Sequence, residues 1–158
     1  MKIVYLSLGS NLGDRTANLS IAIERLSSDE FRVLRTSSVW ETEPRDLPNQ
    51  PWFLNQVVEA ETSLFPRQLL HRLHRIERGL GRVRTTPKGP RIIDIDILLF
   101  GRAVVHAADL EIPHPRMTER RFVLEPLAEL VPDLRHPVIR RTIREMLSGV
   151  AGQAARKV

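Results

Sequence analysis

The sequence contains no cysteine, so disulfide bonds and cysteine-based metal sites are excluded. The same absence fits a reducing compartment, and we expect the protein to be cytoplasmic. No apolar run approaches the roughly 20 residues that a helix needs to cross a bilayer, so no membrane partner is expected. The first residues, MKIVYLSLGSN, alternate apolar with small or polar residues, which predicts a strand rather than a signal peptide.

Lysine is also scarce, because 21 of the 24 basic residues are arginine. The formal net charge is +5 and the sequence pI is about 10.6. Arginine makes planar, bidentate contacts to phosphate, so a basic surface favours an anionic partner, either nucleic acid or a phosphorylated small molecule. An arginine-preferring proteome would give the same total. The positions of the arginines therefore have to decide between these explanations.

The 158 residues suit one domain, residues 1–158, and no shift in composition marks a boundary within it. Hydrophobic periodicity predicts the order β-α-β-β-α-β, followed by further helices. The expected strands are 2–8, 31–40, 53–61 and 92–100, and the expected helices are 19–26, 66–80, 123–130 and 139–147. This order is typical of a ferredoxin-like α+β fold, an antiparallel sheet with helices on one face. Residues 150–158 are predicted to be a frayed tail.

The last strand of this pattern carries two aspartates, in the segment GPRIIDIDILLF. Because side chains alternate along a strand, Asp94 and Asp96 share one face, and Ile93, Ile95 and Ile97 fill the other. The two aspartate Cα atoms should be roughly 6 to 7 Å apart. Two carboxylates that close repel each other in a dry site, which favours a divalent cation such as Mg²⁺ between them. An exposed strand face with solvated aspartates would give the same pattern.

Arginines near this pair strengthen the metal interpretation. Arg91 comes just before the strand, and Arg82 and Arg84 lie in the loop upstream of it. Metal together with converging arginines is how a protein holds a polyphosphate. The hypothesis from these residues is that the aspartates hold metal on a nucleotide.

Other candidate residues are ambiguous by pattern alone. Glu77, on the second helix, is expected to be an ordinary solvated charge. His114 lies between two prolines and could equally be a turn residue. Phe53 and Phe122 would be core residues.

Five segments occur in order and at the right spacing for a known family: SLGSNLGD, FLNQVVEAET, IERGLGRVR, GPRIIDIDILLF and IPHPRMTERRFVLEPL. Together they resemble the hydroxymethyldihydropterin pyrophosphokinases of folate biosynthesis, over about residues 2–132. The resemblance implies a ferredoxin-like α+β fold. It also implies transfer of the β,γ-diphosphate of ATP to the hydroxymethyl oxygen of 6-hydroxymethyl-7,8-dihydropterin, leaving AMP.

The resemblance also implies roles for individual residues. Asp94 and Asp96 match the ligands of two Mg²⁺ ions. Four residues match the family's catalytic residues: Arg82, Arg91, Asp94 and Asp96. The ATP-binding matches are Glu77, Arg82, Arg84, Arg91, Ile97, His114 and Arg120. The pterin-binding matches are Thr42, Phe53, Asn55 and Phe122, with the two phenylalanine rings stacking on the pterin. The expected partners are therefore ATP and the pterin, with no nucleic acid, and we expect a monomer.

Two departures and two alternatives accompany this interpretation. Lys88 stands where many family members have tryptophan, and Thr85 where a basic residue is frequent. Another two-metal enzyme on a similar sheet, such as a nucleotidyltransferase or cyclase, would explain the aspartates but not the pterin-binding matches. An RNA-binding module would use aromatic residues on an open sheet face, but aspartates there would repel phosphates without metal.

Overall fold

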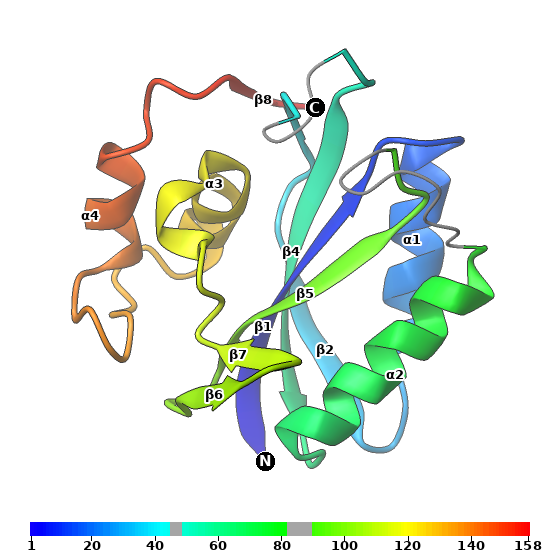
Figure 1. The fold of residues 1–158 in the computed structure, drawn as a ribbon, viewed down its shortest axis with the longest axis vertical. Coiled ribbons are helices and arrows are strands. Elements are labelled where there is room, and N and C mark those ends of the chain that lie inside the picture. The colour runs from blue at the N-terminus through cyan, green and yellow to red at the C-terminus, as the bar shows by residue number, and fades with distance from the viewer. Residues whose placement is uncertain (45–48, 82–89) are drawn as a thin grey trace.

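A computed structural model describes residues 1–44, 49–81 and 90–158. An antiparallel sheet has helices packed on both faces (Figure 1). The elements in chain order are β1 (Lys2–Ser10), α1 (Arg15–Leu26), β2 (Phe31–Thr36), β3 (Trp40–Thr42), β4 (Phe53–Thr62), α2 (Pro66–Gly79), β5 (Asp94–Phe100), β6 (Val105–Ala107), β7 (Leu110–Ile112), the 3-10 helix η1 (Met117–Glu119), α3 (Arg121–Leu130), α4 (Ile143–Ser148) and β8 (Ala155–Lys157). Within these three ranges, no helix has the length and apolar character to span a membrane.

The strand order confirms the ferredoxin-like α+β prediction. The sheet runs β5-β1-β4-β3-β8, and β2 also pairs with β4. Strand β1 pairs antiparallel with β4 and with β5, so the first and last strands of the β-α-β-β-α-β unit lie side by side. A separate hairpin of β6 and β7, which periodicity did not predict, follows β5.

The first face of the sheet is covered by α1 and α2. Residues at helical spacing, among them Leu19, Leu69 and Leu73, pack on the strand residues Leu6 and Leu8 and are almost fully buried. Burying each such leucine contributes roughly 1.5–3 kcal/mol. Asp14 caps α1 by accepting a hydrogen bond from the Ala17 N–H at 3.1 Å.

The second face is covered only in part, by α3 and α4. Their apolar residues pack against Tyr5, Val57 and Leu99 of the sheet. This corrects the expectation that helices lie on one face alone. Beyond α3, the same face carries the small or polar residues Ser7 and Gly9, and the site described below lies there.

Two element boundaries differ from the prediction. The expected strand 31–40 is divided, because β2 ends at Thr36 and the Ser37 hydroxyl accepts the Val57 N–H at 2.9 Å before β3 begins. Helix α4 begins at Ile143 rather than near residue 139. Thr142 sets that start, because its hydroxyl accepts the Glu145 N–H at 3.1 Å and its own N–H donates to the Glu145 carboxylate at 3.2 Å.

The expectation that residues 150–158 fray is wrong. Strand β8 pairs antiparallel with β3, placing Lys157, Arg156 and Ala155 opposite Trp40, Glu41 and Thr42 in turn. The outer edge of β3 offers backbone N–H and C=O groups that a passing segment can pair with. The segment AGQAARKV has no apolar alternation, so periodicity carries no signal of this strand.

A charged cluster lies on the second face. Glu59 is 8% exposed and accepts hydrogen bonds from Arg35 Nε and Nη2, both at 2.8 Å, and from the Tyr5 hydroxyl at 2.7 Å. The hydrogen bonds from Arg35 hold the pKa of Glu59 below its usual range. Because the folded-state pKa is depressed, ionised Glu59 stabilises the fold above its unfolded pKa, and this contribution is lost as the pH falls through the folded pKa.

We expect Glu59→Gln to lower the free energy of unfolding by about 2 kcal/mol at pH 7. A neutral amide would replace the charged carboxylate that accepts three hydrogen bonds. Denaturant unfolding from pH 7 to pH 2.5 measures this. The difference between wild type and variant should shrink as the pH falls below the pKa of unfolded glutamate and through the lower folded-state pKa of Glu59, where the wild type is protonated as well. Glu61→Gln, on the same strand in a surface ion pair with Arg32, is the control and should change stability much less. Equal effects of the two variants at every pH would contradict the expectation.

Candidate functional site

Asp94 and Asp96 lie on one face of β5, as the alternation predicts. They pair across the sheet with Gly9 and Ser7 of β1. Their side chains are 20% and 40% exposed, and both line a cavity. The two aspartates therefore lie in hollows of the surface and not on a fully exposed strand face.

One cavity, here called the aromatic cavity, has a volume of about 410 Å³ and lies on the second face of the sheet. It is lined by Ser7, Gly9, Thr42, Glu43, Gln50, Phe53, Asn55, Arg91, Asp94, Asp96, His114, Pro115, Arg116, Arg120 and Phe122. The four residues predicted to bind a flat ring all contribute to this lining. Phe122 lies in the first turn of α3. Thr42 comes from β3, and Phe53 and Asn55 come from β4.

A second cavity, here called the α2 cavity, has a volume of about 420 Å³. Helix α2, strand β5 and the β6–β7 hairpin supply most of its lining, which includes Leu70, Glu77, Ile97 and Leu110. The two cavities share Asp94, Asp96, His114 and Pro115. Two different ligands could therefore meet at the aspartates.

The absence of a side chain at Gly9 makes room in the aromatic cavity. A Cβ atom there would lie 3.1 Å from Asn55 Oδ1 and 3.4 Å from Phe53 Cδ1. Asn55 is 2% exposed and donates a hydrogen bond from Nδ2 to the Thr42 hydroxyl. The cavity thus combines a fixed amide and hydroxyl with two half-buried aromatic rings, Phe53 and Phe122. Gly9 was not predicted as a site residue, although it lies in the segment SLGSNLGD.

Cations accompany both rings. The Arg91 guanidinium lies 5.9 Å from the centre of the Phe53 ring, and that of Arg120 lies 5.3 Å from the centre of the Phe122 ring. Arg91 Nη1 also contacts Asp94 Oδ2 at 3.1 Å. Among the described residues, the buried Arg91 Nε has no hydrogen-bond partner. Two arginines thus lie where an anionic ligand would enter.

The negative charge of Asp94 and Asp96 is only partly balanced by neighbouring arginines such as Arg91. The partial burial of Asp96 among the cavity residues, with the negative charge of Asp94, raises the pKa of Asp96 above its usual range. A divalent cation would relieve both effects. In the part of the chain that the structure describes, no group of three or more His, Asp or Glu side chains is placed to hold a metal. Two carboxylates fit Mg²⁺, which keeps waters and takes phosphate oxygens at its other positions.

His114 lies at the junction of the two cavities in its neutral form. Burial, together with the positive charge of Arg120, lowers the pKa of His114 to about 4. Its Nε2 atom is 3.9 Å from Asp96 Oδ2, but a neutral imidazole makes no ion pair there. Its Nδ1 atom accepts the Arg116 N–H at 3.2 Å, so Nε2 carries the proton and can donate to a ligand.

Glu77 is not a solvated helix charge, and that expectation is wrong. The residue is 3% exposed, and its carboxylate accepts the Ile95 N–H at 2.8 Å. This bond ties α2 to the aspartate-bearing strand at the α2 cavity. The helical pattern alone could not reveal it, because Glu77 lies only one residue beyond the buried stripe position Ile76.

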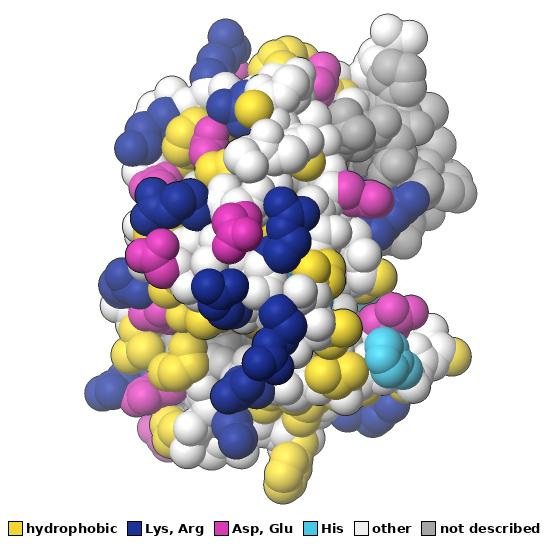
Figure 2. Space-filling model, turned by 90° about the vertical axis from the view of Figure 1, so that its left-hand side faces the viewer, with side chains coloured by type: hydrophobic (Ala, Val, Ile, Leu, Met, Phe, Trp, Pro, Cys, Tyr) yellow, Lys and Arg dark blue, Asp and Glu magenta, His cyan; other side chains and the backbone are white. Residues whose placement is uncertain are grey.

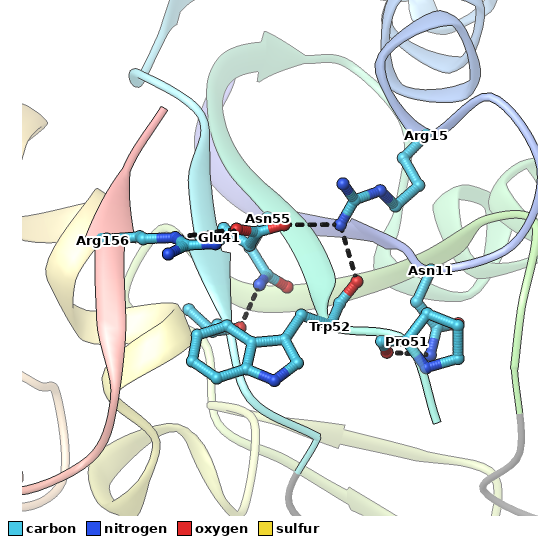
Figure 3. A network of polar contacts seen from close by, with 8 residues as sticks. Asn11, Arg15, Glu41, Pro51, Trp52, Asn55 and Arg156 are labelled. Atoms are coloured by element: carbon cyan, nitrogen blue, oxygen red, sulfur yellow. Dashed lines mark hydrogen bonds and ion pairs between the residues drawn. The ribbon is translucent and has the colours of Figure 1, made fainter. Parts of the chain in front are cut away.

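A polar network that the sequence did not reveal joins the ends of neighbouring segments (Figure 3). Asn11 Nδ2 donates to the Pro51 carbonyl at 3.0 Å, and Asn11 Oδ1 accepts the Arg91 N–H at 2.7 Å. Arg15 Nη1 donates to the Trp52 carbonyl at 2.8 Å and to Glu41 at 2.9 Å. These residues are far apart in the sequence, so no spacing signal links them.

Other basic residues lie outside the described part of the chain or on a surface away from the two cavities. Arg82, Arg84, Thr85 and Lys88 lie outside the described residues. Figure 2 shows the face on which α3 and α4 lie, where Lys and Arg side chains gather in a broad band with Asp and Glu among them. Arg135, Arg140, Arg141 and Arg144 are exposed in this region. Part of the net positive charge therefore lies away from the cavities. The positions of Arg91 and Arg120 are better evidence for an anionic ligand than the net charge is.

A sequence profile of the 7,8-dihydro-6-hydroxymethylpterin-pyrophosphokinase (HPPK) family matches residues 5–132. The chain belongs to this family. The 2-amino-4-hydroxy-6-hydroxymethyldihydropteridine pyrophosphokinase of Aquifex aeolicus is 42% identical over 146 residues, which cover 92% of this chain and 90% of that protein. The Bacillus subtilis protein of the same name is 47% identical over 129 residues, 81% of this chain and 77% of that protein. The predicted resemblance is confirmed.

Longer proteins also match parts of their own length to this chain. The folic acid synthesis protein fol1 of Pneumocystis carinii is 50% identical over 135 residues, 85% of this chain but 18% of that protein. The chain spans about a fifth of the length of the fol1 relatives, 18% to 22%. Plasmodium falciparum HPPK-DHPS has a TM-score of 0.78 at 18% identity, covering 96% of this chain and 43% of that one. At that identity, the likeness shows the HPPK fold alone.

Proposed function

We propose that residues 1–158 form a single ATP-dependent pyrophosphokinase domain. Its reaction would transfer the β,γ-diphosphate of ATP to the hydroxymethyl group of 6-hydroxymethyl-7,8-dihydropterin, giving the pterin diphosphate and AMP for folate biosynthesis. The observation that carries this proposal is the position of Asp94 and Asp96, where the aromatic cavity and the α2 cavity meet. A transfer between two bound substrates needs such a junction.

The aromatic cavity suits the pterin. Phe53 and Phe122 would stack on the faces of the flat ring, and stacked aromatic pairs contribute roughly 0.5–1.5 kcal/mol beyond the area they bury. Asn55 and Thr42 would hydrogen-bond the ring edge, since both are buried and already oriented towards each other. Family membership supports the roles of Phe53, Asn55 and Phe122, because these three residues lie in segments that carry the resemblance.

The α2 cavity suits the nucleotide. Ile97, together with Leu70 and Leu110, gives it an apolar part, and Glu77 gives it a carboxylate. His114 and Arg120 lie nearer the junction, where the phosphates would pass from one cavity to the other. Arg82 and Arg84 are proposed as further phosphate ligands on the strength of the sequence resemblance.

Asp94 and Asp96 would hold two Mg²⁺ ions. When bound, the ions neutralise phosphate charge and align the attacking hydroxyl with the β-phosphorus. In the transfer, the pterin hydroxyl oxygen would bond the β-phosphorus and release its proton to solvent, the bond from that phosphorus to the α–β bridging oxygen would break, and AMP would leave with the electron pair. Arg91 and Arg120 would offset negative charge on the transferred group, and Arg82 is proposed to do the same.

Isothermal titration tests the proposal. The protein is titrated with a non-hydrolysable ATP analogue and Mg²⁺, and then with the pterin in the presence and absence of that analogue. We expect the pterin to bind more tightly when the analogue is present, because both ligands meet at the same two carboxylates. With ATP itself, the products should be AMP and pterin diphosphate, without free diphosphate. Nucleotide binding without any pterin binding would overturn the proposed acceptor.

A further inference from the structure

The C-terminal segment, residues 151–158, contacts both walls of the aromatic cavity. One wall consists of β3 and the residues next to it, including Thr42 and Glu43. The other wall contains Arg120 and Phe122, at the end of η1 and the start of α3. The two walls come from distant parts of the sequence, so whatever joins them affects the width of the cavity.

The end of the segment is bound to the first wall. Strand β8 pairs with β3 along its full length of three residues, and the Val158 N–H adds a hydrogen bond to the Val39 carbonyl at 2.9 Å. The Ala154 N–H donates to Glu43 Oε1 at 3.2 Å. Without β8, the strand that carries Thr42 would be an edge strand held only by β4.

Arg156 extends this contact to the network in Figure 3. Its Nε atom donates to Glu41 Oε1 at 2.8 Å, and its guanidinium lies 5.5 Å from the centre of the Trp52 ring. Glu41 also contacts Arg15, which in turn holds the Trp52 carbonyl. Arg156 therefore links β3 to the residue that immediately precedes Phe53.

The start of the segment is bound to the second wall. Gln153 Oε1 accepts the Arg121 N–H at 2.9 Å, and Gln153 Nε2 donates to the Glu119 carbonyl at 2.8 Å. The Arg121 side chain returns two hydrogen bonds, to the carbonyls of Gln153 at 2.6 Å and Ala151 at 3.1 Å. Arg120 and Phe122 flank Arg121, so these four bonds hold the backbone that presents both cavity residues.

We propose that residues 151–158 act as a strap that joins the two walls of the aromatic cavity, with Gln153 and Arg156 as positioning residues for the pterin. This inference rests on the proposed function for the identity of the ligand. The strap would keep Thr42 and Phe122 at the separation that a flat ring needs, so that binding does not have to order them. Neither Gln153 nor Arg156 lines the cavity, and both act through the residues they contact.

The test uses the full chain with Gln153→Ala, Arg156→Ala and the double variant. Each single variant should raise the Kd and KM for the pterin roughly fivefold to twentyfold, with kcat changed less than about threefold. Because the strap works only when both ends are held, the double variant should be little worse than either single variant. Arg156→Lys keeps a cation for Glu41 and should recover part of the loss. Amide hydrogen exchange at residues 40–42 should become faster in Arg156→Ala.

Two controls separate positioning from a general loss of stability. Lys157→Ala alters the same strand at a side chain that lies over Trp40, outside the cavity lining. Glu59→Gln destabilises the sheet at a site remote from the strap. Neither should change the pterin KM. Equal KM effects in the controls, or fully additive effects of Gln153→Ala and Arg156→Ala, would overturn the strap. If the wild-type protein binds no pterin, the proposed function fails, and the hydrogen exchange alone then decides whether the segment holds the walls.

Discussion

Asp96→Asn should lower kcat for diphosphate transfer by roughly 10³-fold or more at saturating Mg²⁺. Asparagine keeps the shape of the side chain but removes one of the two carboxylates at the junction of the cavities. The remaining carboxylate, Asp94, already contacts Arg91 at 3.1 Å. A site with one negative charge fewer should hold divalent cations poorly, and the phosphate charge would then stay largely unbalanced. Initial rates of AMP formation across a Mg²⁺ series measure the effect.

The same substitution should not weaken the fold. The pKa of Asp96 is raised by burial and by Asp94, so the folded state binds a proton more readily than the unfolded state. Metal-free wild type should therefore lose stability as the pH rises from the unfolded pKa through the folded pKa, and Asp96→Asn should lack that loss. Asp29→Asn makes the same chemical change at an exposed position and is the control for both measurements. Near-normal transfer by Asp96→Asn would show that the metal assignment is wrong.

Asn55→Ala should raise the Kd for the pterin by about 100-fold, while binding of the ATP analogue changes less than about threefold. Asn55 is 2% exposed, and the hydrogen bonds of a buried amide contribute roughly 1–3 kcal/mol each when their loss leaves a partner unsatisfied. Alanine would leave both the pterin edge and the Thr42 hydroxyl without that partner. Titration of each ligand separately measures the difference.

Gln56→Ala is the matched control for Asn55→Ala. It removes an amide from the next position of β4, where the side chain donates to the Ser37 carbonyl at 2.9 Å on the opposite face of the sheet. It should leave pterin binding unchanged. A variant at Asn55 that lost binding of the ATP analogue and kept the pterin would assign Asn55 to the other ligand.

Local patterns account for the elements that the sequence predicted well. Leu69 and Leu73 follow helical spacing, and α2 buries both of them. Asp94 and Asp96 alternate with isoleucines, and β5 presents the two sets on opposite faces. These patterns depend only on the repeat of a helix or strand, so they can be found without knowledge of the neighbouring segments.

Residues whose role depends on a distant partner were missed or misjudged. Glu77 resembled a solvated charge because its partner, the Ile95 N–H, lies 18 residues further along the chain. The tail resembled a frayed end because its partner strand, β3, lies more than 110 residues before it. Gly9 contributes by the space it leaves beside Asn55, and a sequence does not show which side chain would need that space.

The sequence by itself determined the order of the main strands and helices, the shared face of Asp94 and Asp96, and membership in the HPPK family, because each is encoded in local spacing or in ordered segments. Only the tertiary structure decided that two cavities meet at the aspartates, that His114 is neutral there, and that residues 151–158 join the two cavity walls. The reason is physical: cavity shape, burial and pKa depend on which distant segments pack together, and packing brings these segments together only in the folded chain.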